Sequence, residues 1–384
     1  MASQTSGFKK LLFGLFTVVL VLGVLEIAAR AAFPWIFPKG EFSIRMLQGE
    51  AQIVYQRAIG QSYLNYVSAP NFENEFGIQH NAHGYRGPLV EVAKPPDTLR
   101  ILCLGGSTTY GWGVDRPDQT YPAHLQQALA ANLPGKFRNV EVINGGLPWG
   151  TSAELLTHYH FKYHYYQPDW VVIHSGLNDA QAFDAPYYQP DYDHFRRQMP
   201  GPTALPERAR WLTHSRLVDL FLILLLVEPH PEEASFNKAL SEPADIPWFE
   251  KERPDRAEPK RISPGKIAYV HNIETLVDQI QNDGGQVVLM PVAWHPGIAQ
   301  DKSNWDSIYR QTGNSVRYTL VFEGLLKEIA RERGATYVRF PVEQMNQSNW
   351  ADAMHLDSDG SRKKAEYVAS FIRSAIERDS APNP

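Results

Sequence analysis

The stretch LRILCLGGSTT, residues 99–109, sets the expectation for the fold. A short run of Leu and Ile that ends at paired glycines is typical of a parallel strand buried on both faces. In a doubly wound sheet, active groups gather at the carboxyl ends of the strands. We therefore expect an α/β fold in which Ser107, directly after the first strand, stands at the active edge.

Four later stretches resemble this first strand and alternate with helical segments. The expected strands are residues 99–104, 140–143, 170–174, 286–292 and 336–340. The expected helices are residues 121–131, 152–164, 264–282, 316–333 and 358–377. Five strands separated by helices predict an open α/β/α sandwich. We assign the catalytic domain to residues 99–378.

The first 33 residues differ in character from the rest of the chain. After Lys9 and Lys10, residues 11–25 carry no charge, and the apolar character resumes up to residue 33. As one helix, residues 11–33 would extend roughly 35 Å, enough to cross a hydrocarbon core of about 30 Å. Lysines before the span favour a cytoplasmic tail, residues 1–10, and an exported catalytic domain. We expect a single-pass membrane anchor; the alternative is a cleaved signal peptide and a secreted protein.

Two segments outside the strand and helix pattern need a separate interpretation. Residues 34–98 are rich in aromatic residues, Gly and Pro, which predicts an ordered lead-in packed on the catalytic domain. There Arg86 is expected to tie the lead-in to the core, with a substrate contact as the alternative. Residues 180–262 are expected to form an insertion or lid. Their apolar run, residues 217–227, predicts a buried helix; a wall for an acyl chain or a contact with the membrane surface is the alternative.

The turns after the second and third strands supply hydrogen-bond donors. Gly146 offers an unhindered backbone N–H, and Asn178 offers a side-chain amide. Together with the Ser107 N–H, these groups are expected to form a three-donor hole for the oxyanion that develops when a carbonyl is attacked. Gly145 is the alternative to Gly146. Taken singly, each turn has the Asn and Gly residues common in any turn.

A further polar pair precedes the last helix. Asp352 and His355 are three residues apart, so in a helix or turn their side chains lie on one face. The carboxylate can then fix the imidazole tautomer while the other ring nitrogen takes the serine proton. We expect Ser107, His355 and Asp352 to form a catalytic triad.

In combination, these features follow the order of a known family. Ser after the first strand, Gly after the second, Gly-x-Asn-Asp after the third and Asp-x-x-His before the final helix resemble the blocks of the SGNH hydrolases, the GDSL-like lipases and esterases. The resemblance covers about residues 99–376, without the insertion. It implies a flavodoxin-like three-layer sandwich with a five-stranded parallel sheet, the same triad, and Gly146 and Asn178 as oxyanion donors. The first block departs from the family, with Gly-Gly-Ser-Thr in place of Gly-Asp-Ser-Leu, and this leaves the substrate open.

The net charge, the single cysteine and the placement of the histidines argue against several classes of function. A net charge of −5 without a basic cluster argues against nucleic acid as a partner. Cys103 is the only cysteine, which excludes an intrachain disulfide and a Cys-based zinc motif. His160 and His164 share a helical face, but solvated or packed histidines are the preferred interpretation over a metal site. His295, after the fourth strand, is a possible substrate contact. We expect no metal and no cofactor.

The predicted activity is cleavage of carboxylic esters through an acyl-enzyme. An O-acetyltransferase or deacetylase acting on cell-envelope polysaccharide would use the same residues. A catalytically silent envelope module that binds glycan or lipid is the alternative from another class. The expected partners are a small-molecule, lipid or glycan ester and the membrane. The pattern gives no indication of oligomeric state.

Overall fold

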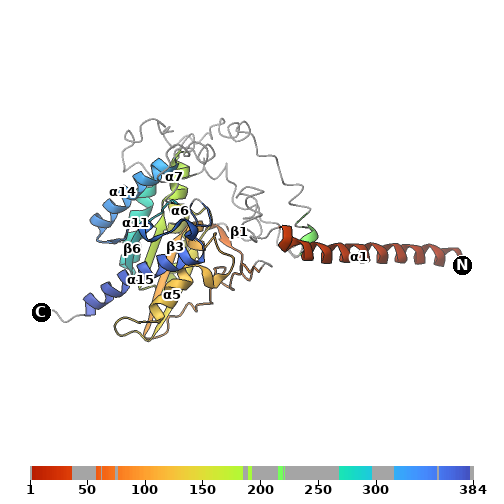
Figure 1. The fold of residues 1–384 in the computed structure, drawn as a ribbon, viewed down its shortest axis with the longest axis horizontal. Helices are drawn as coiled ribbons and strands as arrows, with labels where there is room; N and C mark the ends of the chain where they lie inside the picture. Colours follow the sequence, from red (N-terminus) through yellow and green to blue (C-terminus); the bar gives the residue numbers. More distant parts are fainter. Residues whose placement is uncertain are drawn as a thin grey trace. The chain divides into compact units, whose positions relative to one another are not determined.

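The structure, a computed structural model, describes residues 2–36, 58–61, 63–73, 77–184, 189–192, 215–218, 220, 268–295, 315–352 and 354–380. The chain divides into two units, residues 1–56 with 202–232, and residues 57–201 with 233–384. The second unit contains the parallel sheet, some of whose strands are labelled in Figure 1. It also contains every predicted site residue.

Five parallel strands form the sheet of the second unit. They are β3 (Thr98–Gly105), β4 (Asn139–Gly146), β5 (Trp170–Ser175), β6 (Gln286–Pro291) and β7 (Thr336–Tyr337). Their order in space is β4-β3-β5-β6-β7. Counted along the chain, this is second, first, third, fourth and fifth, the flavodoxin-like order. The five predicted strands are confirmed, although β7 is only two residues long.

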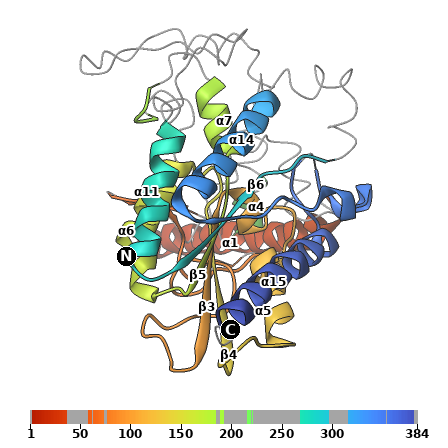
Figure 2. The same cartoon turned by 90° about the vertical axis from the view of Figure 1, so that its left-hand side faces the viewer.

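Helices cover both faces of the sheet, and its central strands β3 and β5 are therefore buried along their whole length. Along β3, Leu99, Ile101 and Cys103 face one hydrophobic cluster, whereas Leu102 and Leu104 face the other. The first cluster includes residues of α5 (Tyr121–Ala130) and α15 (Ser358–Ser380); the second includes residues of α6 (Ser152–Phe161), α11 (Ala268–Asn282) and α14 (Ser315–Arg333). Figure 2 shows α6 and α11 on one side of the strands and α5 and α15 on the other. The predicted three-layer sandwich is confirmed.

Several short elements were not expected from the sequence. They are the antiparallel strands β1 (Ala58–Gln61) and β2 (Asn65–Ser68), the helices α4 (Ser107–Tyr110) and α7 (Leu177–Asp184), and the 3₁₀ turns η1 (Pro117–Gln119), η2 (Tyr163–Tyr166), η6 (Val342–Gln344) and η7 (Gln347–Asn349). Of these, α4 and α7 matter most for function because each begins where a sheet strand ends.

The described part of the lead-in contacts the catalytic core through buried side chains. Arg86 is fully buried, and its guanidinium donates to the carbonyl oxygens of Gly111 at 2.6 Å and Val114 at 3.0 Å. From the core side, His158 Nε2 donates to the carbonyl oxygen of Tyr66 at 3.0 Å. Arg86 therefore acts as the expected tie, and His158 has a structural role.

The first unit contains the long helix α1 (Ala2–Ile36). Its segment Gly7–Ala32 has a mean hydropathy of 2.6 and is long enough to cross a membrane, a test that a signal sequence also passes. Glu26, near the end of this segment, accepts hydrogen bonds from the backbone N–H groups of Arg216 and Leu217 at 3.0 and 2.9 Å. Most of the predicted insertion, including most of the apolar run 217–227, lies outside the described residues.

Candidate active site

Ser107 lies at the point where the strand order reverses. β3 pairs with β4 on one side and with β5 on the other, and Ser107 opens α4 directly after β3. As the first helical residue, Ser107 has a backbone N–H with no acceptor inside α4. The preceding glycine permits a close approach, because a Cβ on Gly106 would lie 2.8 Å from Asn178 Nδ2. The side chain and N–H of Ser107 are thus brought beside the Asn178 amide.

The turn before α15 presents His355 to this serine. His355 Nε2 lies 2.8 Å from Ser107 Oγ, and His355 Nδ1 lies 2.6 Å from Asp352 Oδ2. The other carboxylate oxygen of Asp352 accepts the backbone N–H groups of Met354 at 2.9 Å and His355 at 2.7 Å. The imidazole is almost completely buried, with 1% of the residue exposed. The structure therefore brings all three predicted triad residues into one hydrogen-bonded series.

Electrostatics keep Asp352 ionised in this series. Burial by itself raises the pKa of Asp352, but the His355 ring and two backbone N–H donors outweigh it and lower the pKa to about 2. An ionised carboxylate accepts the Nδ1 proton of His355, which leaves Nε2 as the acceptor for the serine hydroxyl. Such a series can move a proton from Ser107 Oγ to His355.

Asn178 is held at the same edge by the loop after β4. Its Nδ2 donates to the carbonyl oxygen of Gly150 at 2.8 Å, which leaves its second amide hydrogen for another acceptor. Asp179 accepts the Ser152 N–H at 3.0 Å and the Tyr192 hydroxyl at 2.6 Å. Burial raises the pKa of Asp179 to about 6 against the effect of these hydrogen bonds. The start of α7, and with it Asn178, is thereby fixed against the start of α6.

The expected donor at Gly146 is contradicted by the geometry. β4 continues through Gly146, whose N–H already donates to Asn144 Oδ1 at 3.0 Å. A Cβ at Gly146 would lie 2.1 Å from Tyr110 N, so this glycine packs beneath α4 instead of facing a ligand. The alternative, Gly145, is also paired within the strand, and a Cβ there would meet Leu104 in the core. Neither glycine offers a free donor at the site.

Gly150 and Thr151 are the site residues that the sequence analysis missed. Gly150 supplies the carbonyl that orients Asn178, and its own N–H donates to the Leu147 carbonyl oxygen at 2.9 Å. Thr151 forms a capping box with Glu154 at the start of α6. A Thr-x-x-Glu pattern is a recognisable helix start, so this spacing was a signal that could have located the loop.

His295 lies close to the loop that carries the triad acid and base. Its ring packs edge-on against Trp350 with a centroid distance of 5.9 Å, and Trp350 is bridged to Leu356, the residue after His355. A substrate contact for His295 stays a prediction. Within the described part of the chain, no group of three or more His, Cys, Asp or Glu side chains is arranged to hold a metal.

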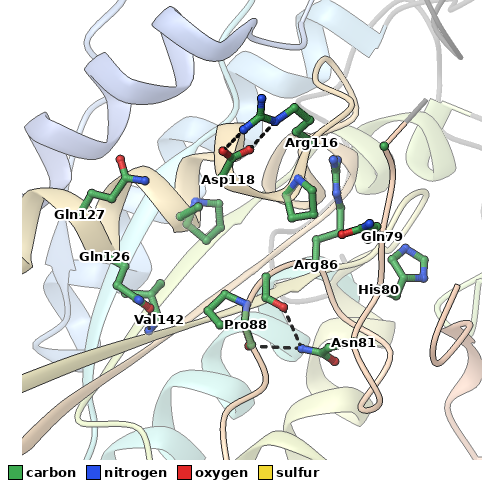
Figure 3. A pocket seen from close by; sticks show the side chains of 15 residues that line it. Gln79, His80, Asn81, Arg86, Pro88, Arg116, Asp118, Gln126, Gln127 and Val142 are labelled. Atoms are coloured by element: carbon green, nitrogen blue, oxygen red, sulfur yellow. Dashed lines mark hydrogen bonds and ion pairs between the residues drawn. The ribbon is translucent and has the colours of Figure 1, made fainter. Parts of the chain in front are cut away.

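A cavity of about 680 Å³ lies between the lead-in and α5 (Figure 3). Gln79, Asn81, Arg86 and Gln126 are among its lining residues, and Figure 3 shows the Asn81 amide bonded within the lead-in. None of the three triad residues lines it. This cavity is therefore separate from the candidate active site.

The fold and site together define a doubly wound α/β protein with a Ser-His-Asp series at the carboxyl edge of its sheet. Residues 103–363 match the GDSL-like Lipase/Acylhydrolase family, and the chain belongs to this family of ester-hydrolysing enzymes. A search of curated proteins finds no match.

Similar solved structures include three with low sequence identity. TesA is 15% identical over 72% of this chain and 98% of its own, with a TM-score of 0.40. A GDSL-like lipase from Bacteroides thetaiotaomicron is 13% identical over 76% and 93%, with a TM-score of 0.38. Axe2, an acetylxylan esterase from Geobacillus stearothermophilus, is 15% identical over 74% and 94%, with a TM-score of 0.37.

Proposed function

We propose that this enzyme is a membrane-anchored serine esterase that works through an acyl-enzyme on Ser107. The observation that carries the proposal is the unbroken series from Ser107 Oγ through His355 to Asp352, with bonds of 2.8 and 2.6 Å. A histidine that accepts from a serine hydroxyl and donates to an ionised carboxylate is equipped for nucleophilic catalysis.

In the first step, His355 Nε2 takes the Ser107 proton as Oγ attacks the ester carbonyl. Asp352 stabilises the resulting imidazolium but keeps its own charge. The tetrahedral intermediate collapses when the C–O bond to the alcohol breaks and His355 returns the proton to the leaving oxygen. Water, or another hydroxyl acceptor, then attacks the acyl-serine by the same proton transfers, and Ser107 is regenerated.

The oxyanion is assigned to two donors, the Ser107 N–H and the second amide hydrogen of Asn178. The support is that Asn178 Nδ2 lies against the glycine that precedes Ser107 and is held there by the Gly150 carbonyl. Loss of one such donor lowers kcat by about 10² to 10³ in serine hydrolases. Asn178→Ala should therefore cause a loss of about that size, with a smaller change in KM.

The direct test is hydrolysis of p-nitrophenyl acetate by the wild type and by Ser107→Ala. The variant should keep the circular dichroism spectrum and unfolding midpoint of the wild type, because only the hydroxyl oxygen is removed, and it should lose ester hydrolysis. Activity equal to the wild type would reject Ser107 as the nucleophile. Product analysis with and without a polysaccharide acceptor would then distinguish transfer to water from transfer to a sugar hydroxyl.

We further infer that α1 is retained as an anchor and is not removed as a signal peptide. The support is Glu26, whose carboxylate accepts from Ser215 Oγ at 2.7 Å and from two backbone N–H groups that follow. Cleavage after Ala31 would take Glu26 away and leave these three donors without their acceptor. Lys9 and Lys10 favour a cytoplasmic N-terminus and an extracytoplasmic catalytic domain.

A full-length protein with a C-terminal tag tests retention. The protein should resist carbonate extraction from membranes, and its mass should include residues 2–31. A soluble product that begins near Ala32 would show that the segment is a signal peptide.

A further inference from the structure

A lysine and a histidine are buried together beneath the nucleophile turn. Lys364, on α15, is 1% exposed, and its Nζ lies 2.7 Å from Nδ1 of His174, which is 2% exposed. His174 lies near the end of β5, where it is in register with Gly105 of β3. The pair is thus located directly below the two residues, Gly106 and Ser107, that turn the chain from β3 into α4.

The same ring nitrogen reaches the nucleophile turn. His174 Nδ1 lies 3.2 Å from Oγ1 of Thr108, the residue that follows Ser107. On the basis of the proposed function, we propose that Lys364 and His174 are positioning residues. They hold Thr108, and through it the first turn of α4, so that Ser107 Oγ stays within hydrogen-bond reach of His355.

The surroundings of Lys364 explain why Lys364 and His174 are not both protonated to their cationic forms. The ammonium group lies 3.9 Å from the centroid of the Tyr121 ring, and the Cys103 thiol is close by. Within the described residues no carboxylate forms an ion pair with Lys364. Burial raises the pKa of both Cys103 and Tyr121, so both stay neutral near pH 7. Lys364 and His174 therefore have no anionic neighbour that would favour a positive charge on both side chains.

The protonation state sets the direction of the hydrogen bond. Burial lowers the pKa of Lys364 to about 7, and burial together with Lys364 lowers the pKa of His174. When Lys364 is charged it can only donate, so His174 Nδ1 accepts from the ammonium and, through the same lone pair, from the Thr108 hydroxyl, and the ring proton resides on Nε2. A second proton on His174 would abolish this acceptor and set two cations 2.7 Å apart.

A purely structural role is a poor account of this lysine. A buried ammonium without a carboxylate costs free energy that an apolar side chain of similar length would not cost. Met at this position would keep the packing against the Tyr121 ring. If Lys364 only filled space, Lys364→Met would leave turnover unchanged; if it positions the turn, the same variant loses turnover without losing stability.

The experiment compares Lys364→Met, His174→Leu and His174→Asn with the wild type. Active sites are titrated with a fluorophosphonate probe, and kcat and KM are measured with p-nitrophenyl acetate. Lys364→Met and His174→Leu should each lower kcat per titrated site roughly tenfold, because misplacement of a reacting group by about 1 Å can cost about 10²-fold and a smaller shift costs less. KM should change less than twofold. His174→Asn places an amide near the Nδ1 position and should recover most of kcat.

Unfolding in urea supplies a readout that does not depend on turnover. Between pH 7 and the ordinary lysine pKa of about 10.4, Lys364 is protonated in the unfolded state but largely deprotonated in the native state. The unfolded state then binds more protons, so the burial of Lys364 makes stability rise with pH across this range. Lys364→Met should be at least as stable as the wild type at pH 6.5, and its advantage should shrink by pH 9.5. Lys327→Met, an exposed lysine paired with Glu323 on α14, is the matched control and should change neither kcat nor stability.

The outcomes separate the two proposals. A wild type that neither reacts with the probe nor hydrolyses the ester would overturn the proposed function and the positioning role that rests on it. An active wild type with unchanged kcat in Lys364→Met and His174→Leu would overturn the positioning role alone. A loss of total ester hydrolysis that is matched by an equal loss of titrated sites and by a loss of stability would also overturn it, because kcat per titrated site would then be unchanged.

Discussion

The Asp352 carboxylate is bonded to His355 twice, through the imidazole Nδ1 at 2.6 Å and through the backbone N–H at 2.7 Å. One side chain therefore shapes the turn and orients the ring that the turn carries. A further bond from the Met354 N–H completes this arrangement. Because all three donors stabilise the charged carboxylate, protonation of Asp352 in acid should destabilise the fold.

Asp352 should contribute stability that is lost only at low pH. Its native pKa, about 2, lies below the ordinary value for an unfolded chain, so the native state binds fewer protons and stability falls as pH drops through this range. A difference of this size corresponds to about 2 kcal/mol. In urea unfolding, the stability difference between the wild type and Asp352→Asn should be largest above pH 5 and shrink towards pH 2. A difference that is constant with pH would contradict the assignment.

Gly106→Ala should impair catalysis more than folding. A Cβ at this position would lie 2.8 Å from Asn178 Nδ2, at the far end of a side chain that can rotate away. We expect kcat to fall by about 10-fold to 10²-fold, no more than the loss of one complete oxyanion donor would cause. The free energy of unfolding should fall by less than about 1 kcal/mol. Gly324→Ala is the control, because a Cβ there meets nothing within 4 Å. Unchanged kcat in Gly106→Ala would show that Asn178 is not part of the oxyanion site.

Arg86→Leu should destabilise the catalytic unit. The buried guanidinium bonds to the carbonyl groups of Gly111, Val114 and Asp115 in the segment after α4, and Leu would leave them without these donors. We expect a loss of about 2 to 5 kcal/mol in the free energy of unfolding, measured with urea at pH 7. A loss below about 0.5 kcal/mol, the size of an ordinary surface substitution, would contradict the role of Arg86 as a tie.

The sheet and the triad could be predicted because their signals are local or follow a family order. Buried parallel strands are short apolar runs, and all five were located; β7 alone is much shorter than its run. Ser107, Asp352 and His355 were expected together, and the structure brings them within hydrogen-bond distance. Their roles in catalysis remain a prediction until tested.

The remaining features depend on where a strand stops and on contacts between distant segments. Gly146 was expected in a turn, but it is the last residue of β4, and its N–H donates to the Asn144 side chain. Asn178 was also expected in a turn, whereas it belongs to the first turn of α7. His174 and Lys364 are 190 residues apart, and each is one polar residue inside an ordinary strand or helix pattern. No local pattern shows that they meet.

The proposed mechanism requires Ser107 Oγ to be the atom that carries the acyl group. The most direct measurement is reaction of the full-length protein with a fluorophosphonate, followed by mass spectrometry of the intact chain and of its peptides. We predict one adduct per chain, located on Ser107, with loss of ester hydrolysis in proportion to labelling and no adduct in Ser107→Ala. An adduct on another residue, or full hydrolysis by a chain that is completely labelled at Ser107, would contradict the account.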